Sequence, residues 1–238
     1  MLFLRSTAFN VFFHLNISIW MLAASPLLLV SGDTLWSVVF AWSRLNLFAL
    51  KWLAGIDVEL RGLENLPATP CIIAAKHQSA FETVSLLHLF RRPAFILKKE
   101  LMRIPLFGWY ASKLVMVPVD RGGGQKTLRA MLDDARQVLN TGRQIIIFPE
   151  GTRVPPGSPP AYKYGIISLY KALGVPVVPV ALNSGLHWPR RGFSRYPGKI
   201  VVEFLPPIAP GLDGTEFMDS LIDAIESKSD QLLLEAAG

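Results

Sequence analysis

The chain has 238 residues, enough for one α/β domain of roughly 150 to 200 residues and an additional segment. Hydrophobic residues make up 51% of it and charged residues 18%, and the mean hydropathy is +0.36. This composition excludes an ordinary water-soluble domain and indicates contact with lipid. The net charge of +6 suits an anionic lipid surface or a phosphorylated ligand. The sequence carries no nucleic-acid-binding motif, so nucleic acid is not an expected partner.

The first segment is strongly hydrophobic and is expected to associate with a membrane. Between Arg5 and Asp33 there is no Asp, Glu, Lys or Arg, and a bilayer crossing needs ~20 residues. A cleaved signal peptide is the alternative, because residues 23–25 offer small side chains, but the preceding segment is poorly charged. The pattern leaves open whether this segment spans the bilayer or enters it and returns.

A second hydrophobic segment, residues 34–55, contains Arg44 and Lys51 among its apolar and tryptophan residues. This mixture predicts an amphipathic helix in the membrane interface. Residues 1–55 are therefore interpreted as membrane-anchoring helices. The excess of basic residues after the first segment favours a cytoplasmic location for residues 56–238. We expect the protein at the inner, cytoplasmic membrane.

From residue 56 onward, predicted strands and helices alternate. Strands are expected at residues 56–60, 71–75, 94–97, 114–119, 144–148, 177–182 and 199–205. Helices are expected after Ser79, from residues 122–124 onward, and at residues 164–173 and 216–234, with a broken amphipathic piece at 98–110. The alternation predicts an α/β fold, a single domain over residues 56–238 with a central, largely parallel sheet flanked by helices. The single cysteine, Cys71, excludes a disulfide framework and indicates a reducing compartment.

The strongest candidates for catalysis are His77 and Glu82, which lie five positions apart behind an apolar run. On one continuous helix, side chains at that spacing would point away from each other. Ser79 and Glu82 have the spacing of a capping box, which puts His77 in the turn before a helix and Glu82 in the first turn of that helix. A purely structural alternative is open, in which Glu82 only completes the cap and His77 is a surface turn residue.

A second motif, Phe-Pro-Glu-Gly-Thr-Arg at residues 148–153, follows another predicted strand. Gly151 permits close approach of a ligand to the backbone, Thr152 offers a hydroxyl group, and Arg153 offers a guanidinium fork that matches phosphate. Glu150 is expected to hold Arg153 in place. Arg121 follows a different strand, so both arginines are expected at the carboxyl ends of sheet strands, where α/β folds bind ligands.

Four segments, HQSAFE, VDRGGG, FPEGTR and VPVVPV, occur in an order and spacing that resemble the four blocks of the 1-acyl-sn-glycerol-3-phosphate acyltransferase family. The resemblance covers roughly residues 60–182. Two positions depart from the family pattern, because Lys76 stands where the family usually has Asn and Glu82 where it usually has Asp. A longer carboxylate can still accept a hydrogen bond from an imidazole, so the resemblance still implies activity.

The resemblance implies transfer of an acyl chain from acyl-CoA or acyl carrier protein to the sn-2 hydroxyl of lysophosphatidic acid, which gives phosphatidic acid in phospholipid biosynthesis. His77 would be the catalytic base, and Glu82 would orient it. The residues implied in binding the substrate phosphate are Arg121, Glu150, Gly151, Thr152 and Arg153. No metal and no cofactor other than the acyl donor is expected, and the expected partners are lysophosphatidic acid, the acyl donor and the bilayer.

The sequence leaves three other functions open. The acceptor could be another lyso-lipid, such as a lyso-ornithine lipid, because the sequence assigns no head-group contacts beyond Arg153. A thioesterase-like hydrolase would transfer the acyl group to water, and a catalytically silent membrane scaffold would not need His77 and Glu82 intact.

Overall fold

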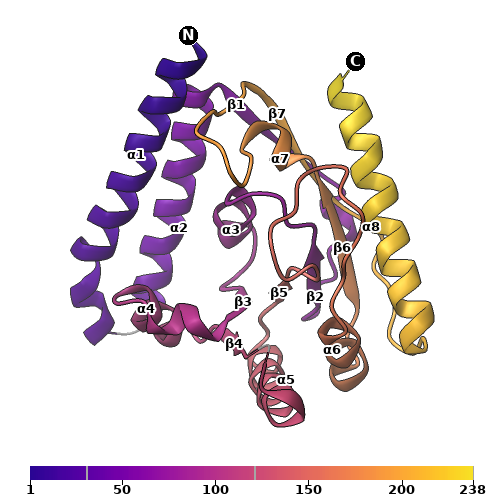
Figure 1. Ribbon diagram of the computed structural model, residues 1–238. Coiled ribbons are helices and arrows are strands. Elements are labelled where there is room, and N and C mark those ends of the chain that lie inside the picture. The colour runs from indigo at the N-terminus through magenta and orange to yellow at the C-terminus, as the bar shows by residue number, and fades with distance from the viewer. Residues whose placement is uncertain (31, 121, 238) are drawn as a thin grey trace.

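The computed structural model describes residues 1–30, 32–120 and 122–237 (Figure 1). Within this part of the chain, seven strands form one sheet in the order β1-β7-β6-β2-β5-β3-β4. The strands are β1 (Ile56–Arg61), β2 (Ile72–Ala75), β3 (Ala94–Lys98), β4 (Val117–Val119), β5 (Ile145–Ile147), β6 (Val177–Leu182) and β7 (Gly198–Phe204). All neighbouring strands are parallel except β6 and β7. The prediction of a largely parallel sheet is therefore confirmed.

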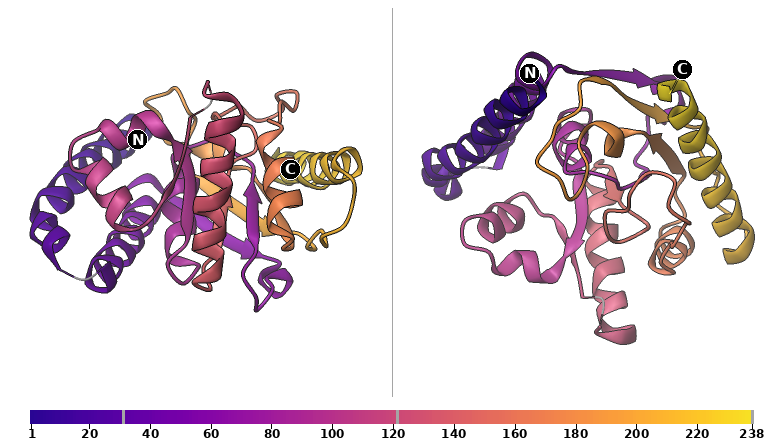
Figure 2. Two further views of the ribbon diagram at one scale, coloured as in Figure 1. Left: turned by 90° about the horizontal axis from the view of Figure 1, so that it is seen from below. Right: turned by 45° about the horizontal axis from the view of Figure 1, so that its top comes forward.

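Helices cover both faces of the sheet. They are α1 (Leu2–Ala23), α2 (Gly32–Ala49), α3 (Phe81–Ser85), α4 (Phe107–Lys113), α5 (Gly124–Asn140), α6 (Gly165–Leu173), α7 (Ser184–His187) and α8 (Gly214–Ala237), and the π-helical turn η2 (Leu50–Ala54) continues α2. Helices α1 and α2 lie side by side at the opposite flank of the molecule from α8 (Figures 1 and 2).

The central strand β2 shows how the sequence builds two cores. Side chains alternate between the two faces of a strand, and all four residues of β2 are buried. Ile73 and Ala75 pack into the cluster that contains Phe9 of α1 and Leu50 of η2. Ile72 and Ala74 pack into the cluster formed with α5, α6 and α8. A strand buried on both faces reads as a continuous apolar run, which is the pattern that predicted it.

Three local features differ from the sequence prediction. The strand expected at 114–119 begins only at Val117, because the backbone N–H groups of Leu114 and Met116 bond back to carbonyl groups of α4 and Val115 has a positive φ of 54°. The helix after Ser79 is short, since α3 ends at Ser85 and a 3-10 turn follows. The four-residue helix α7 was not expected at all.

The N-terminal segment forms helices, as predicted, but they pack along the domain. Asn16 of α1 donates a hydrogen bond to Asn46 of α2 over 3.1 Å, and both residues are buried. Among the described helices, none combines the length and the hydropathy that a membrane crossing needs. The division into units 1–55 and 56–238 stays a prediction.

Candidate active site

Three strand ends bring the candidate residues to one edge of the sheet. His77 follows β2 by two residues, the loop of residues 148–153 follows β5, and Ser184 follows β6. Because β2 pairs in parallel with both β5 and β6, all three carboxyl ends lie at the same edge. This is the edge at which open α/β sheets bind ligands.

The backbone and the ring of His77 are both fixed by the 148–153 loop. The His77 N–H donates to Oε2 of Glu150 over 2.8 Å, and the His77 carbonyl accepts from the N–H of Val154, the residue after the loop, over 2.8 Å. The imidazole stacks on Phe148 with ring centroids 4.0 Å apart. Nδ1 lies 3.5 Å from Oε2 of Glu82, which is longer than a hydrogen bond. Such catalytic contacts are often long without substrate and shorten in the reacting complex.

Glu82 is fully buried, yet hydrogen-bond donors surround its carboxylate. The N–H of Ser79 donates to both carboxylate oxygens over 3.1 and 3.0 Å, and the N–H of Gln78 donates to Oε1 over 3.2 Å. The hydroxyl of Ser184 also donates to Oε1. Hydrogen bonds to backbone N–H groups and to a hydroxyl satisfy the oxygens of a buried carboxylate. The arrangement therefore fixes the position of this carboxylate beside His77.

The capping box expected at Ser79 exists in a modified form. The Glu82 carboxylate accepts from the Ser79 N–H, as the motif requires, while the Ser79 hydroxyl accepts from the N–H of Phe81 over 3.0 Å. The first helical residue is Phe81, with Ala80 as its N-cap. The same carboxylate thus completes the cap and faces His77, so the structural role of Glu82 is compatible with a catalytic one.

The loop after β5 delivers three of the predicted binding residues to one cavity. Gly151, Thr152 and Arg153 line the cavity together with His77. Gly151 has a φ of 68°, a left-handed conformation that favours glycine. Burial lowers the pKa of the Arg153 guanidinium, and the charge of Glu82 opposes that shift. The fifth expected binding residue, Arg121, lies outside the described residues.

The expectation that Glu150 holds Arg153 is wrong. Within residues 1–30, 32–120 and 122–237, no ion pair joins the two side chains, and Glu150 is buried against Lys76, with 2.9 Å between Oε1 and Nζ. Gly151 turns the chain between them, so the Glu150 side chain is buried while Arg153 lines the cavity. Glu150 therefore holds the backbone of His77, through the hydrogen bond that it accepts from the His77 N–H.

Lys76 is the centre of a buried ionic network that the sequence did not predict. Only 2% of its side chain is exposed, and Nζ lies 2.6 Å from a carboxylate oxygen of Glu226 on α8, in addition to its contact with Glu150. The hydroxyl of Tyr162 donates to the other Glu226 oxygen over 2.8 Å. Burial raises the pKa of Glu150, and the hydrogen bond and charge of Lys76 offset only part of that rise. The sequence signal for this network was the position of Lys76, directly after the apolar run at residues 71–75. A lysine that is buried there requires carboxylate partners for its ammonium group.

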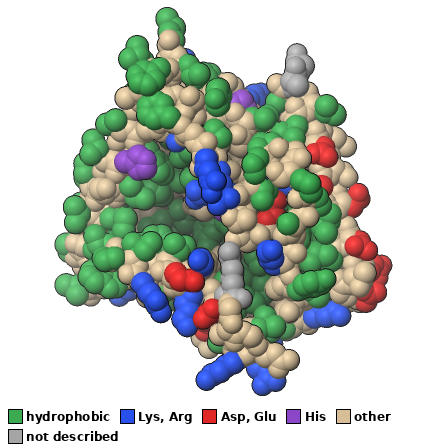
Figure 3. All heavy atoms as spheres, viewed as in Figure 1, with side chains coloured by type: hydrophobic (Ala, Val, Ile, Leu, Met, Phe, Trp, Pro, Cys, Tyr) green, Lys and Arg blue, Asp and Glu red, His purple; other side chains and the backbone are tan. Residues whose placement is uncertain are grey.

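An apolar cavity of about 610 Å³ opens beside the catalytic residues. Its walls come from α1, α2, β3 and α4, and include Trp20, Val38, Leu97 and Tyr110. The space-filling view shows a hollow with hydrophobic walls and with Lys and Arg side chains at its rim (Figure 3). A site with this shape accommodates a hydrocarbon chain, with a polar group at the end near His77.

Cys71 has no part in this site. The residue is 1% exposed, and burial raises the pKa of its thiol to about 11. A thiol in that state is a poor nucleophile at neutral pH. The site therefore supports direct transfer between two bound substrates, assisted by His77.

Comparison with known proteins agrees with the motifs. A family model described as acyltransferase matches residues 57–183. A 1-acyl-sn-glycerol-3-phosphate acyltransferase of Pseudomonas aeruginosa is 35% identical, over 83% of this chain and 77% of that protein. A chloroplastic 1-acyl-sn-glycerol-3-phosphate acyltransferase of Brassica napus is also 35% identical, but over 57% of this chain and 41% of that protein.

The fold also matches a solved structure. The crystal structure of a 1-acyl-sn-glycerophosphate acyltransferase from Thermotoga maritima superposes with a TM-score of 0.77 and covers 98% of both chains. The sequence identity of that pair is 24%, so this likeness supports the fold alone.

Proposed function

Since this chain belongs to the 1-acyl-sn-glycerol-3-phosphate acyltransferase family, we propose that it acylates the sn-2 hydroxyl of lysophosphatidic acid to give phosphatidic acid. The acyl donor is acyl-CoA or acyl carrier protein, and no further cofactor or metal takes part. The observation that carries the proposal is the placement of His77 beside buried Glu82, in the same cavity as Arg153.

His77 acts as the general base in this mechanism. Its Nδ1 faces Glu82, so Nε2 is the nitrogen that takes the proton from the sn-2 hydroxyl. The resulting oxygen nucleophile attacks the thioester carbonyl carbon, the carbon–sulfur bond breaks, and the departing thiolate takes the proton from the imidazolium. Glu82 stabilises the imidazolium and fixes the ring tautomer. Such a base contributes ~10²- to 10⁴-fold in rate.

The loop after β5 positions the acceptor. Arg153 binds the phosphate through its guanidinium, and the exposed Thr152 and the backbone at Gly151, which carries no side chain, offer further contacts. Arg121 keeps its proposed role in the same task. Holding the phosphate here brings the nearby hydroxyl to His77, and such positioning lowers the entropic part of the barrier.

The acyl chain occupies the apolar cavity, and the N-terminal helices bind the membrane. Helix α1 exposes a row of large apolar side chains, among them Leu15, Ile19 and Leu22. An exposed apolar helix face of this kind fits insertion into the bilayer interface. With Arg44 and Lys51 near the lipid head groups, the enzyme sits on the cytoplasmic side of the inner membrane.

The proposal is tested by acyl transfer with purified protein in lipid vesicles. Labelled acyl-CoA is supplied with lysophosphatidic acid, with a lyso-ornithine lipid, or without acceptor, and a second series uses acyl carrier protein as donor. Phosphatidic acid is the expected product, and His77→Ala should form at least a hundredfold less of it. A circular dichroism spectrum establishes that the variant is folded.

Each other outcome rejects one element of the proposal. Free fatty acid released at the same rate without acceptor identifies a hydrolase. Acylation of the lyso-ornithine lipid alone assigns a different acceptor. Full activity of the His77→Ala variant removes the general base from the mechanism.

A further inference from the structure

A second arginine lies at the rim of the cavity, from a segment that the sequence motifs do not include. Arg190 belongs to the loop between α7 and β7 and lines the same cavity as His77 and Arg153. Its Nη1 donates a hydrogen bond to the carbonyl oxygen of Arg153 over 2.6 Å. Two arginine side chains thus line the cavity that contains the proposed catalytic base.

The two guanidinium groups make no direct ion pair in the part of the chain that the structure describes, because no carboxylate lies within 4.0 Å of either one. Burial lowers the pKa of Arg153, the charge of Glu82 opposes that shift, and the charge of Arg190 adds to it. Because the carboxylate of Glu82 faces His77, one carboxylate does not balance both guanidinium groups, and an anion bound between them would be stabilised.

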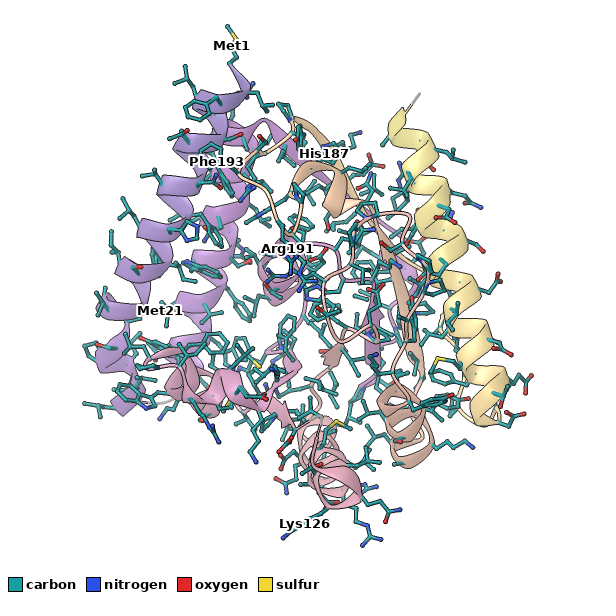
Figure 4. All side chains as sticks on the ribbon, in the orientation of Figure 1. Met1, Met21, Lys126, His187, Arg191 and Phe193 are labelled. Carbon is teal, nitrogen blue, oxygen red and sulfur yellow. The ribbon has the colours of Figure 1, made fainter. Side chains whose placement is uncertain are left out.

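The loop that carries Arg190 is fastened to the other wall of the cavity. The N–H of Arg195 donates to the hydroxyl of Ser6 over 2.8 Å, and the side chain of Asn10 donates to the carbonyl of Phe193 over 2.8 Å. The guanidinium of Arg195 also lies over the ring of Trp188, 5.2 Å from its centroid. In Figure 4 this loop, marked by Phe193 and Arg191, runs from the upper part of α1 towards the centre of the view. Its backbone is held before a ligand arrives, which reduces the entropic cost of binding.

We propose that Arg190 is a second phosphate-binding residue, which forms with Arg153 a paired-guanidinium site for the phosphate monoester of the lysophospholipid acceptor. The inference rests on the proposed function. A phosphate monoester carries a charge of about −1.5 to −2 at neutral pH, which two guanidinium groups balance.

The chemistry of the two substrates favours the acceptor over the donor as the source of the phosphate. Arg153 is close to His77 along the folded backbone, because the residue after Arg153 donates to the His77 carbonyl. In lysophosphatidic acid the reacting hydroxyl is on the carbon next to the one that bears the phosphate ester. In acyl-CoA the phosphates lie at the far end of the pantetheine arm, away from the thioester. A phosphate bound beside His77 therefore belongs to the acceptor.

The neighbouring Arg191 provides a matched control. It is exposed, carries the same charge and is adjacent in sequence, but is not among the described residues that line the cavity. We compare Arg190→Ala and Arg191→Ala with the wild type and measure kcat and both KM values in vesicles. Arg190→Ala should raise the KM for lysophosphatidic acid about ten- to hundredfold, the usual effect of losing a charged hydrogen-bond partner. The KM for acyl-CoA should stay within about twofold, and Arg190→Lys should recover part of the loss.

Three results would overturn the inference. An equal rise in Arg191→Ala would mean that Arg190 acts only through the general positive field. A rise in the KM for acyl-CoA alone would assign Arg190 to the donor. Unchanged constants in Arg190→Ala would show that it binds neither substrate.

A binding measurement separates this inference from the proposed function. Lysophosphatidic acid is titrated into His77→Ala and into His77→Ala/Arg190→Ala, with lysophosphatidylcholine as the phosphodiester comparison. A loss of affinity of about tenfold or more in the double variant, specific to lysophosphatidic acid, supports the phosphate site even if the wild type acylates another lipid. Equal affinities of the two variants would reject it, whatever the catalytic result.

Discussion

Ser184 lies outside the four sequence motifs, yet it contacts the acid that faces the proposed catalytic base. It is buried at the start of α7, and its hydroxyl donates to the Glu82 carboxylate that faces His77. We expect Ser184→Ala to lower kcat about tenfold and to leave the KM for the acceptor nearly unchanged, since the hydroxyl touches the acid and not the substrate. The loss corresponds to one hydrogen bond to a charged group, ~1.5 to 3 kcal/mol at most.

A double-mutant cycle tests that role. If Ser184 acts through Glu82, Ser184→Ala should have little further effect on kcat in a Glu82→Ala background. Additive losses would mean that Ser184 contributes independently of the acid. Thermal unfolding of each variant separates a kinetic effect from simple loss of folded protein.

The buried thiol of Cys71 should make the free energy of unfolding depend on pH in the alkaline range. Burial raises the pKa of its thiol from 9.0 to about 11, so the folded state keeps a proton that the unfolded chain releases in this range. Its stabilising contribution is complete below the unfolded pKa and is lost as the pH rises from about 9 to 11. Two pKa units correspond to about 2 to 3 kcal/mol.

The measurement is the free energy of unfolding by urea at several pH values for wild type and Cys71→Ala. The wild type should lose more stability than the variant between pH 9 and pH 11, because other titrating groups are common to both proteins. Parallel curves for the two proteins would mean that the thiol ionises equally in both states. Activity at pH 7 should survive the substitution, since Cys71 takes no part in the site.

At the level of elements, the Lys76 network connects the end of β2 to α8. Removing Glu226 leaves Lys76 paired with Glu150 but deprives Lys76 and the Tyr162 hydroxyl of a buried hydrogen-bond acceptor. We therefore expect Glu226→Ala to destabilise the protein by about 2 to 3 kcal/mol, and to lower kcat because Glu150 also accepts from the His77 N–H.

Lys228 on the same helix offers a comparison. Its Nζ lies 3.1 Å from Glu203, in a pair more exposed than that of Lys76. Lys228→Ala should cost no more than ~1 kcal/mol, as more exposed pairs usually do. Urea unfolding of both variants measures the difference. Similar losses would indicate that the α8 contact, and not the buried charge of Lys76, determines the effect.

The accuracy of the sequence prediction follows the range of the interactions involved. The bounds of β2 and the start of α5 were predicted within one or two residues, because strand burial and helix periodicity depend on residues that are neighbours in sequence. The pairing of Glu150 with Lys76 was missed, because the two residues are separated by 74 positions in sequence. The antiparallel pairing of β6 with β7 was missed for the same reason, since strand direction is set by the connection and not by the strand's own pattern.

On the scale of the whole molecule, the cavity exists only because the N-terminal helices pack against the α/β domain. Ala24, just after α1, is a small residue in the cavity wall. In the view of Figure 4, Met21 of α1 is well separated from the loop that carries Arg191. A bulkier side chain at position 24 should shorten the space for an acyl chain while leaving the catalytic residues in place.

We therefore expect Ala24→Phe to shift the preferred acyl donor towards shorter chains. The measurement is kcat/KM for a series of acyl-CoA donors of increasing length. The control is Ala236→Phe, because Ala236 is exposed on α8 and does not line the cavity, and this variant should leave the preference unchanged. A uniform loss for all chain lengths in Ala24→Phe would indicate overpacking of the fold and not a shorter cavity.

The apolar face of α1 provides the last prediction, which concerns how the whole protein meets the bilayer. Leu15 and Ile19 are 58% and 60% exposed and lie one turn apart on the same helix face. Neither side chain is needed to fill the core, so Leu15→Asp/Ile19→Asp should fold normally. Each substitution removes apolar area that lipid would bury, and together they should weaken binding to anionic vesicles at least tenfold.

Leu234 is the matched control for this experiment. It is 75% exposed on α8, at the opposite flank of the molecule from α1 (Figure 1). Leu234→Asp should bind vesicles like the wild type if α1 forms the membrane contact, and co-sedimentation with vesicles measures both variants. Weakened binding in Leu234→Asp alone would move the contact to α8. With lipid bound along α1, the apolar cavity between α1, α2 and α4 lies next to the bilayer, so that an acyl chain can pass from the membrane to His77 without crossing water.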